Sequence, residues 1–365
     1  MERAVRGILK GLRCPCDRRR RLVVVVVVTA GLIAAVLVPS LVWRLSPGQL
    51  PTPSGSEGVG RRELLVTDHN RADPFRAGAI RALSVFVFYP AQPNAEPRAA
   101  YAPGLWAQAL DAVAGGGSFL VRPSSSILGN GVADAPSASG HHPLLLFEPG
   151  YGKTALDYTA LLEDLASQGF VVAAITPTGS APVTVLDGQI VHATPDGLAD
   201  ETDAQTFEAD LRQRILPVWI DDFASVRSAL AGQAGQPWSG QIDATHVGLF
   251  GHSFSGASSF EACARFAWCA AAVDIDGTTF IETEVANRPR LLLGLSDERE
   301  ALSHLVGIDF AAPVRAPHMA VSDLAWRLNP WLVMILGQRA AAPEILIRAT
   351  SHAIATFFNG LRQNQ

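Results

Sequence analysis

The chain has few lysines and little positive charge beyond its first residues. Only two lysines, Lys10 and Lys153, occur among 365 residues. The net charge of −5 includes a segment of +6 at residues 1–21, so the rest of the chain carries −11. A nucleic-acid-binding domain needs a basic surface, and this globular part is acidic. We therefore expect no nucleic-acid partner.

Cysteines and clusters of metal ligands are also scarce. The chain has four cysteines, and none directly follows the apolar N-terminal run, as a lipoprotein anchor would require. His141 and His142 are adjacent, but neighbouring side chains on a strand point to opposite faces, and no third ligand is near in the sequence. We expect neither a metal nor an organic cofactor.

A long apolar run, residues 22–43, stands near the N-terminus. Its 22 residues contain no charged side chain. A helix of this length spans roughly 33 Å, enough to cross a bilayer core of about 30 Å. Four arginines at 18–21 precede the run, and such positive flanks stay in the cytoplasm. We predict a single-pass transmembrane signal anchor in the cell membrane, with residues 1–21 cytoplasmic; the alternative is a cleaved signal peptide and a secreted protein.

The part of the chain beyond this run divides into two segments. Residues 44–61 are rich in proline, glycine and serine, and we interpret them as a linker. Residues 62–365 are long enough for one domain with a large core. Because an extracytoplasmic compartment is oxidising, Cys263 and Cys269 are predicted to form a disulfide.

Apolar runs typical of strands alternate with helical patterns through most of residues 62–365. Strands are predicted at 64–67, 83–89, 144–147, 170–175, 247–250, 271–275, 291–295 and 306–312, and helices at 105–113, 155–168, 207–230 (bent at Pro217) and 345–361. This alternation predicts an α/β fold with a mostly parallel sheet flanked by helices. Functional side chains are then expected at the carboxyl ends of the strands.

The clearest motif is Gly251-His252-Ser253-Phe254-Ser255-Gly256, which joins a predicted strand to a predicted helix. A serine on a sharp strand-to-helix turn, between small residues, is typical of the nucleophile elbow of α/β-hydrolases. The strict pattern has glycine two residues after the serine, where this chain has Ser255, a residue small enough to substitute. We predict that Ser253 is a nucleophile.

Such a serine needs a histidine base, which in this fold follows it in the sequence. The histidines after Ser253 are His304, His318 and His352. His352 falls inside the last helical pattern. His318 lies between a strand-like stretch and a predicted helix start, where a base is expected, and is our predicted base.

The acid that orients the histidine should lie between the serine and the histidine in the sequence. Asp274 falls within a predicted strand. Asp276 and Asp297 both follow strands, and spacing alone does not separate them. The oxyanion hole needs two backbone N–H donors, for which we predict Phe254, directly after the serine, and Tyr151, in the glycine-containing loop 147–152.

Several segments resemble the platelet-activating-factor acetylhydrolase-like lipases of the α/β-hydrolase superfamily. The similar segments are TDHNRADPF and RALSVFVFYPA, PLLLFEPGYG, LASQGFVVAAI, GHSFSG, DIDG and HMAVSDL, spread over residues 63–361. The resemblance implies that Ser253 is the nucleophile, Asp276 the acid and His318 the base, with Tyr151 and Phe254 as oxyanion donors. It therefore favours Asp276 over Asp297.

These observations together predict a serine ester hydrolase acting on lipid or short-acyl esters through an acyl-enzyme. Two alternatives stay open: a polyester or cutinase-like esterase, and a non-catalytic, membrane-tethered binding protein with the same fold. An intact set of serine, aspartate and histidine argues against the second alternative. The sequence contains no signal for an oligomeric state.

Overall fold

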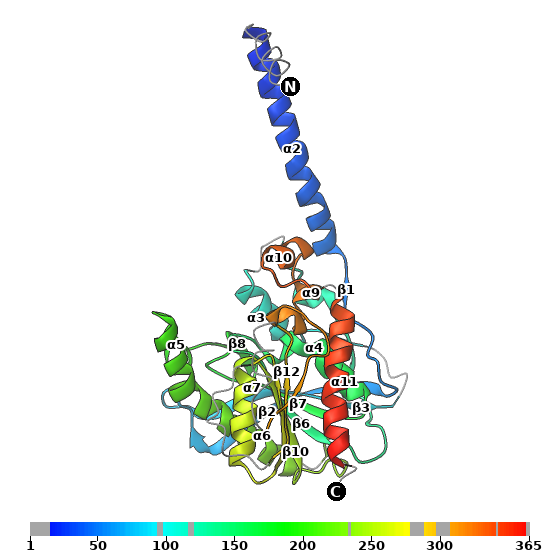
Figure 1. Ribbon diagram of the computed structural model, residues 1–365, viewed down its shortest axis with the longest axis vertical. Helices are drawn as coiled ribbons and strands as arrows, with labels where there is room; N and C mark the ends of the chain where they lie inside the picture. Colours follow the sequence, from blue (N-terminus) through cyan, green and yellow to red (C-terminus); the bar gives the residue numbers. More distant parts are fainter. Residues whose placement is uncertain are drawn as a thin grey trace. The chain divides into compact units, whose positions relative to one another are not determined.

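The computed structural model describes residues 15–92, 98–115, 120–232, 235–277, 288–296, 307–340 and 342–362 (Figure 1). The chain divides into two compact units, Met1–Ser46 and Pro47–Gln365. In the described part of the first unit, residues 15–46, there is one long helix, α2 (Pro15–Leu45). Its stretch Leu22–Leu45 is long and apolar enough to cross a membrane, and each of the valines Val23–Val28 is more than half exposed. Length and composition fit both a membrane anchor and a signal sequence.

The second unit is built on a mixed, mostly parallel sheet, as the alternating pattern predicts. Its parallel strands are β7 (Val171–Thr176), β6 (Leu144–Glu148), β10 (Val247–His252), β11 (Cys269–Ile275), β12 (Arg290–Leu293) and β13 (Asp309–Ala311), side by side in this order. At the β7 edge the sheet continues through β3 (Ile80–Ala91), β2 (Gly58–Ala72), β5 (Ile127–Ala133) and β1 (Gly48–Gln49), with β4 (Arg98–Ala100) on β5. β3 is antiparallel to both of its neighbours.

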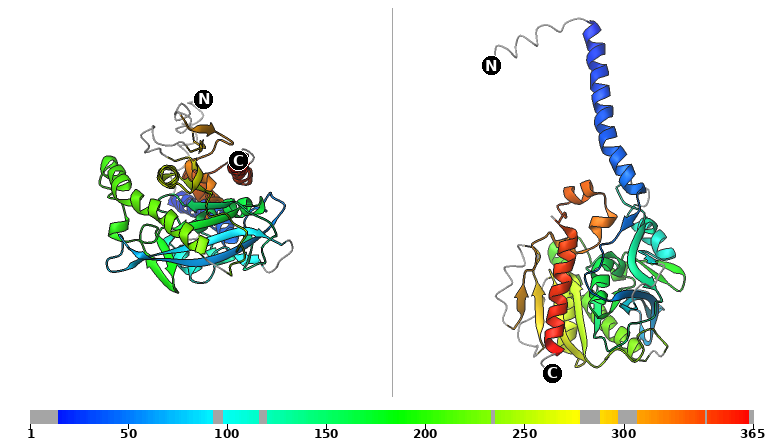
Figure 2. Two further views of the ribbon diagram at one scale, coloured as in Figure 1. Left: turned by 90° about the horizontal axis from the view of Figure 1, so that it is seen from below. Right: turned by 90° about the vertical axis from the view of Figure 1, so that its right-hand side faces the viewer.

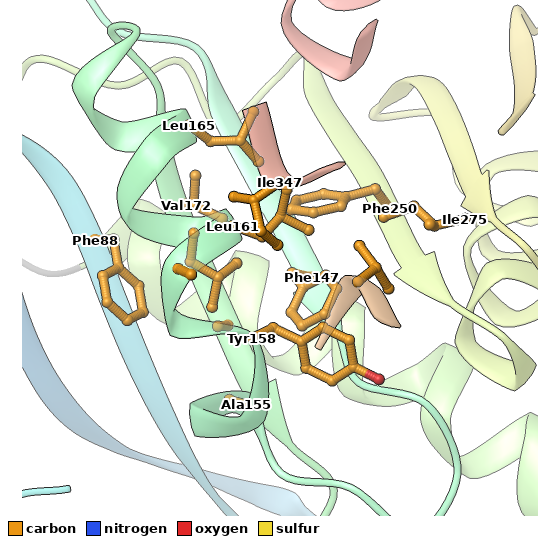
Figure 3. Close-up of a cluster of buried hydrophobic side chains, with 14 of the residues drawn as sticks. Phe88, Phe147, Ala155, Tyr158, Leu161, Leu165, Val172, Phe250, Ile275 and Ile347 are labelled. Atoms are coloured by element: carbon orange, nitrogen blue, oxygen red, sulfur yellow. The ribbon is translucent and has the colours of Figure 1, made fainter. Parts of the chain in front are cut away.

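Period-two alternation along the central strands directs side chains to two cores. In β6, Leu145 and Phe147 enter one core, and Leu144 and Leu146 enter the other. Helices α4 (Thr159–Ser167) and α11 (Pro343–Arg362) cover the first face, and α6 (Leu216–Gly232) and α7 (Phe254–Arg265) cover the second (Figures 1 and 2). Figure 3 shows part of the first core, around Phe147 and Tyr158. Every residue of the central strands β7, β6 and β10 is buried, as expected for mainly apolar parallel strands covered on both faces.

The segment 44–61, predicted as a linker, is part of the folded unit from Pro47 onward. β1 pairs with β5 and β2 begins at Gly58, while Leu50 is 1% exposed. A Cβ at Gly55 would lie 2.0 Å from the carbonyl oxygen of Ser167, so this glycine permits close packing rather than flexibility. Composition alone does not distinguish these two uses of glycine.

The predicted helix 207–230 is longer and has three parts. α5 (Ala204–Asp210) continues through a π-turn, η4 (Leu211–Ile215), into α6. Pro217 is the second residue of α6, close to the π-turn, and it lacks the N–H that an interior backbone hydrogen bond needs. The remaining elements are η1 (Ser124–Ser126), η2 (Ala155–Tyr158), η3 (Pro195–Gly197), η5 (His318–Val321), α3 (Leu105–Val113), α9 (Leu324–Arg327), α10 (Pro330–Ile335), β8 (Val183–Leu186) and β9 (Gln189–His192).

Candidate active site

Ser253 stands on a strained turn between β10 and α7. Its φ of 60° and ψ of −122° lie in a region that L-residues rarely adopt. The turn is crowded: a Cβ at Gly251 would lie 2.3 Å from Ser255 Oγ, and one at Gly256 would lie 1.9 Å from Asp274 Oδ1. The two glycines therefore allow the strand and the helix to approach, and the serine projects beyond the strand end.

Ser255, which departs from the strict motif, has a defined structural role. Its hydroxyl donates to the carbonyl oxygen of Glu148 at 2.6 Å and to that of His252 at 3.0 Å. It therefore ties the ends of the neighbouring strands β6 and β10 to the start of α7. The missing glycine is compensated at Gly251, where the absence of a side chain makes room for this hydroxyl.

Three predicted site residues form one hydrogen-bonded chain. Ser253 Oγ lies 2.9 Å from His318 Nε2, and His318 Nδ1 lies 2.7 Å from Asp276 Oδ2. The carboxylate only accepts, so Nδ1 carries the proton and Nε2 presents its lone pair to the serine hydroxyl. The imidazole is therefore held in the tautomer that can take a proton from Ser253.

Asp276 is held as an anion in a buried turn. Its Oδ1 accepts from the N–H groups of Leu295 and Ser296, at 2.8 and 2.9 Å, and from Ser296 Oγ at 3.1 Å. Burial alone would raise the pKa of Asp276, but the hydrogen bonds from His318 and from these N–H groups outweigh it and lower the pKa to about 2. The Asp276 side chain is 0% exposed and that of His318 is 32% exposed, so the imidazole is open to solvent and the carboxylate is not.

The predicted oxyanion donors lie at the same sheet edge. Glu148 pairs with Gly251 in the register of β6 and β10, so the turn after β6, with Tyr151, and the elbow after β10 leave the sheet side by side. Phe254 is the first residue of α7, where helix N–H groups point outward. The Tyr151 ring packs edge-on against Phe254, and its hydroxyl accepts from the N–H of Ala199 at 2.6 Å. This anchors the turn.

The alternative candidates for the acid and the base are Asp274, Asp297, His304 and His352. Asp297 and His304 lie outside the residues that the structure describes. His352 is on the exposed side of α11. Asp274, within β11 as predicted, accepts from the N–H of Gly277 at 2.7 Å and so shapes the turn that carries Asp276.

Other residues near the site were not identified from the sequence. His252, directly before the serine, is fully buried, and its Nδ1 lies 2.8 Å from the Tyr158 hydroxyl. Ser296, whose N–H and hydroxyl donate to Asp276, directly follows the predicted strand 291–295, and this position is the one signal for it in the sequence. His142 lies away from this site, before the amino end of β6, and its Nδ1 is 3.0 Å from the carbonyl oxygen of Gly169. Among the described residues, no group of three metal-ligating side chains occurs.

Cys263 and Cys269 form a disulfide with a Cα–Cα distance of 5.1 Å. The bond joins α7, the helix that begins at the elbow, to β11, the strand that leads to Asp276. The helix that follows Ser253 and the strand that precedes Asp276 are therefore linked covalently at their far ends.

Comparison with known proteins reveals distant relatives, while no family model matches the chain. Platelet-activating factor acetylhydrolase of Cavia porcellus is 26% identical over 231 residues, which are 57% of this chain and 51% of that protein. A probable 1-alkyl-2-acetylglycerophosphocholine esterase of Arthroderma benhamiae (strain ATCC MYA-4681 / CBS 112371) is 24% identical over 268 residues, 68% of this chain and 64% of that protein. The chain thus spans about half to two thirds of the length of these relatives.

A solved structure extends the likeness over nearly the whole fold. The ferulic acid esterase from Streptomyces cinnamoneus has a TM-score of 0.68 and 26% sequence identity, covering 86% of this chain and 93% of that protein. The two chains therefore share the same overall fold. The sequence relatives and the structural neighbour agree: the chain is distantly similar to platelet-activating-factor acetylhydrolases and has the fold of an esterase of the α/β-hydrolase kind.

Proposed function

We propose that this protein is a serine ester hydrolase in which Ser253 is the nucleophile, His318 the base and Asp276 the acid. The observation that carries the proposal is the chain of two hydrogen bonds, 2.9 and 2.7 Å long, that links the three side chains. An ionised, fully buried Asp276 beside a partly exposed His318 has the charge distribution that this chemistry needs.

The first half-reaction forms an acyl-enzyme. Ser253 Oγ bonds to the ester carbonyl carbon as its proton passes to His318 Nε2, and the carbonyl oxygen becomes an oxyanion. The backbone N–H groups of Tyr151 and Phe254 stabilise that negative charge, and the positive end of α7 stabilises it further. The C–O bond then breaks, and the alcohol leaves with the proton from His318. In the second half-reaction, water attacks the acyl carbon and gives a proton to His318. The bond to Ser253 Oγ then breaks, Ser253 takes the proton back, and the carboxylic acid product leaves.

For the substrate, we propose a lipid or short-acyl ester. The names of the two sequence relatives give platelet-activating factor and 1-alkyl-2-acetylglycerophosphocholine as their substrates. α10, which begins twelve residues after His318, exposes Trp331, Ile335 and the adjoining Leu336 by 56%, 76% and 52%. An apolar surface of this kind fits esters with an apolar part. A second candidate is an aromatic ester, since the ferulic acid esterase covers more of this fold than either relative.

For the location, we propose that α2 remains as a membrane anchor with the hydrolase outside the cytoplasm. α2 extends to Leu45 and β1 begins at Gly48, which leaves little extended chain for a signal peptidase. Mass spectrometry of the protein purified from membranes tests this. An intact N-terminal peptide is expected, and a mature chain that begins beyond residue 30 would contradict the anchor.

The test of the activity uses the full chain, a fluorophosphonate probe and nitrophenyl esters from C2 to C12. Wild type should be labelled and hydrolyse esters, Ser253→Ala should do neither, and Ser259→Ala, on the same helix, should retain both. Adding 1-alkyl-2-acetylglycerophosphocholine and methyl ferulate to the panel separates the two substrate classes. Wild type that is neither labelled nor active would overturn the proposal and favour a binding protein.

A further inference from the structure

A second histidine is packed against the proposed base and has no assigned task. The rings of His252 and His318 have centroids 4.6 Å apart and planes 36° apart. His252 is 0% exposed, and both of its ring nitrogens have partners: Nε2 lies 2.9 Å from the carbonyl oxygen of His318, and Nδ1 lies 2.8 Å from the Tyr158 hydroxyl.

The directions of these hydrogen bonds follow from chemistry. A carbonyl oxygen only accepts, so His252 carries its proton on Nε2 and donates to His318. Nδ1 then accepts from the Tyr158 hydroxyl, whose oxygen accepts from the N–H of Gly150 at 3.2 Å. A continuous chain therefore runs from Gly150 N–H through Tyr158 and His252 to the main chain of His318. Figure 3 shows the Tyr158 hydroxyl pointing away from the core that holds its ring.

We propose that His252 and Tyr158 are positioning residues, which hold the main chain of His318 and the turn at Gly150 in fixed register around Ser253. This proposal rests on the proposed hydrolase function. The side chain of His318 is held by Ser253 and Asp276, but its backbone belongs to η5, a turn of only four residues. Gly150 directly precedes Tyr151, the proposed oxyanion donor, so one chain connects the base and the oxyanion turn.

The surroundings support this role. A Cβ at Gly150 would lie 3.0 Å from His252 Nδ1 and 3.1 Å from Tyr158 Oη, so a side chain there would disturb both bonds. Burial, and then the charge of His318, lower the pKa of His252 to about 3, against the hydrogen bond to His318 and the charge of Asp276. His252 thus stays neutral beside the imidazolium that forms during catalysis, where a second cation would be repelled.

The first test is Tyr158→Phe, which removes one hydroxyl and keeps the ring. The matched control is Tyr89→Phe, because Tyr89 is equally buried and its hydroxyl donates to the carbonyl oxygen of Ala135 at 2.8 Å, in the other core. We expect Tyr158→Phe to lower kcat about tenfold with KM within about twofold, and Tyr89→Phe to leave both unchanged. Equal kcat for the two variants would overturn the proposal.

The second test asks whether a donor at position 252 rescues the rate. His252→Gln retains an N–H for the His318 carbonyl and should keep kcat within about threefold, whereas His252→Leu should lower it about a hundredfold. Melting temperatures show which variants are folded; if His252→Leu is not, the two tyrosine variants decide. If wild type is active but the kcat of His252→Gln is no higher than that of a folded His252→Leu, the positioning role is overturned and the hydrolase function stands. Inactive wild type would overturn the hydrolase function beneath it.

Discussion

Two buried carboxylates of this protein, Asp276 and Asp222, each lie beside a positive or potentially positive partner, with different consequences. Asp276 faces His318, which is 32% exposed. Asp222 lies on α6 and accepts from Arg81 Nε of β3 at 3.0 Å and from Arg71 Nη1 of β2 at 2.6 Å. The side chains of Asp222 and Arg81 are both 0% exposed.

The two pairs differ in whether the partner can lose its proton and whether solvent reaches it, and these two features separate a structural ion pair from a proposed catalytic pair. Arg81 keeps its proton at any physiological pH and is closed to solvent, so its pair with Asp222 can only stabilise or specify the fold. His318 can gain and lose a proton, and one side of it is open. Two equally buried carboxylates therefore have different roles: Asp222 stabilises the fold, and Asp276 is proposed to act in catalysis. Substitution of each residue tests this distinction.

The largest expected effect is on turnover, from Asp276→Asn. The amide can no longer hold His318 in the required tautomer or stabilise its charged form, so we expect kcat to fall about 10⁴-fold with the protein still folded. Ester hydrolysis and circular dichroism measure both. Asp297→Asn, made in parallel, should keep wild-type kcat. If Asp297→Asn loses the activity and Asp276→Asn keeps it, the acid is Asp297.

The second effect is on stability, from Asp222→Asn. It leaves Arg81 buried without its main counter-charge, so we expect about 3–5 kcal/mol less free energy of unfolding in urea, with kcat per folded molecule unchanged. The neighbouring Asp221 is the matched control, since it pairs with Arg265 at the surface, with side chains 40% and 57% exposed. Asp221→Asn should cost less than about 1 kcal/mol. Similar losses for both would refute the distinction.

A third effect is a pH dependence of stability that arises from His252. Its pKa is about 3 in the fold against 6.5 as the ordinary value, so as pH falls below 6.5 the unfolded chain takes up the proton first. Folding is therefore weakened between pH 6.5 and 3, by about 1.4 kcal/mol per pH unit in this window. Urea unfolding of wild type and His252→Gln measures the difference, and equal slopes between pH 6 and 4 would contradict it.

Asp276 adds a second pH dependence to the stability of the protein, at lower pH. Its pKa of about 2 lies below the ordinary 3.8, so its contribution to stability is complete above pH 3.8 and is lost as pH falls toward 2. Asp276→Asn should then flatten the stability curve only below about pH 4. Of the two contributions to stability, only that of His252 changes with pH between pH 6.5 and 4, because that of Asp276 changes below pH 4. The two contributions can therefore be measured separately.

Local patterns in the sequence predicted much of the architecture. The strand-to-helix turn around Ser253, the alternating α/β pattern and the apolar helix at residues 22–43 all rest on side-chain periodicity or length within short segments. The linker at 44–61 was a wrong prediction from composition, because glycine serves close packing at Gly55 as well as flexibility. Nothing in a local pattern distinguishes these two uses.

By itself, the sequence determined the elbow, the class of fold and the short list of acids and bases, since these depend on neighbours in the chain. Only the tertiary structure brought His318 to within hydrogen-bond distance of Asp276 and Ser253, 42 and 65 residues away in sequence. It also gave His252 and Tyr158, 94 residues apart, a shared hydrogen bond. Such contacts are decided by how the strands are ordered in the sheet, because that order determines which loops meet at the edge where the parallel strands end.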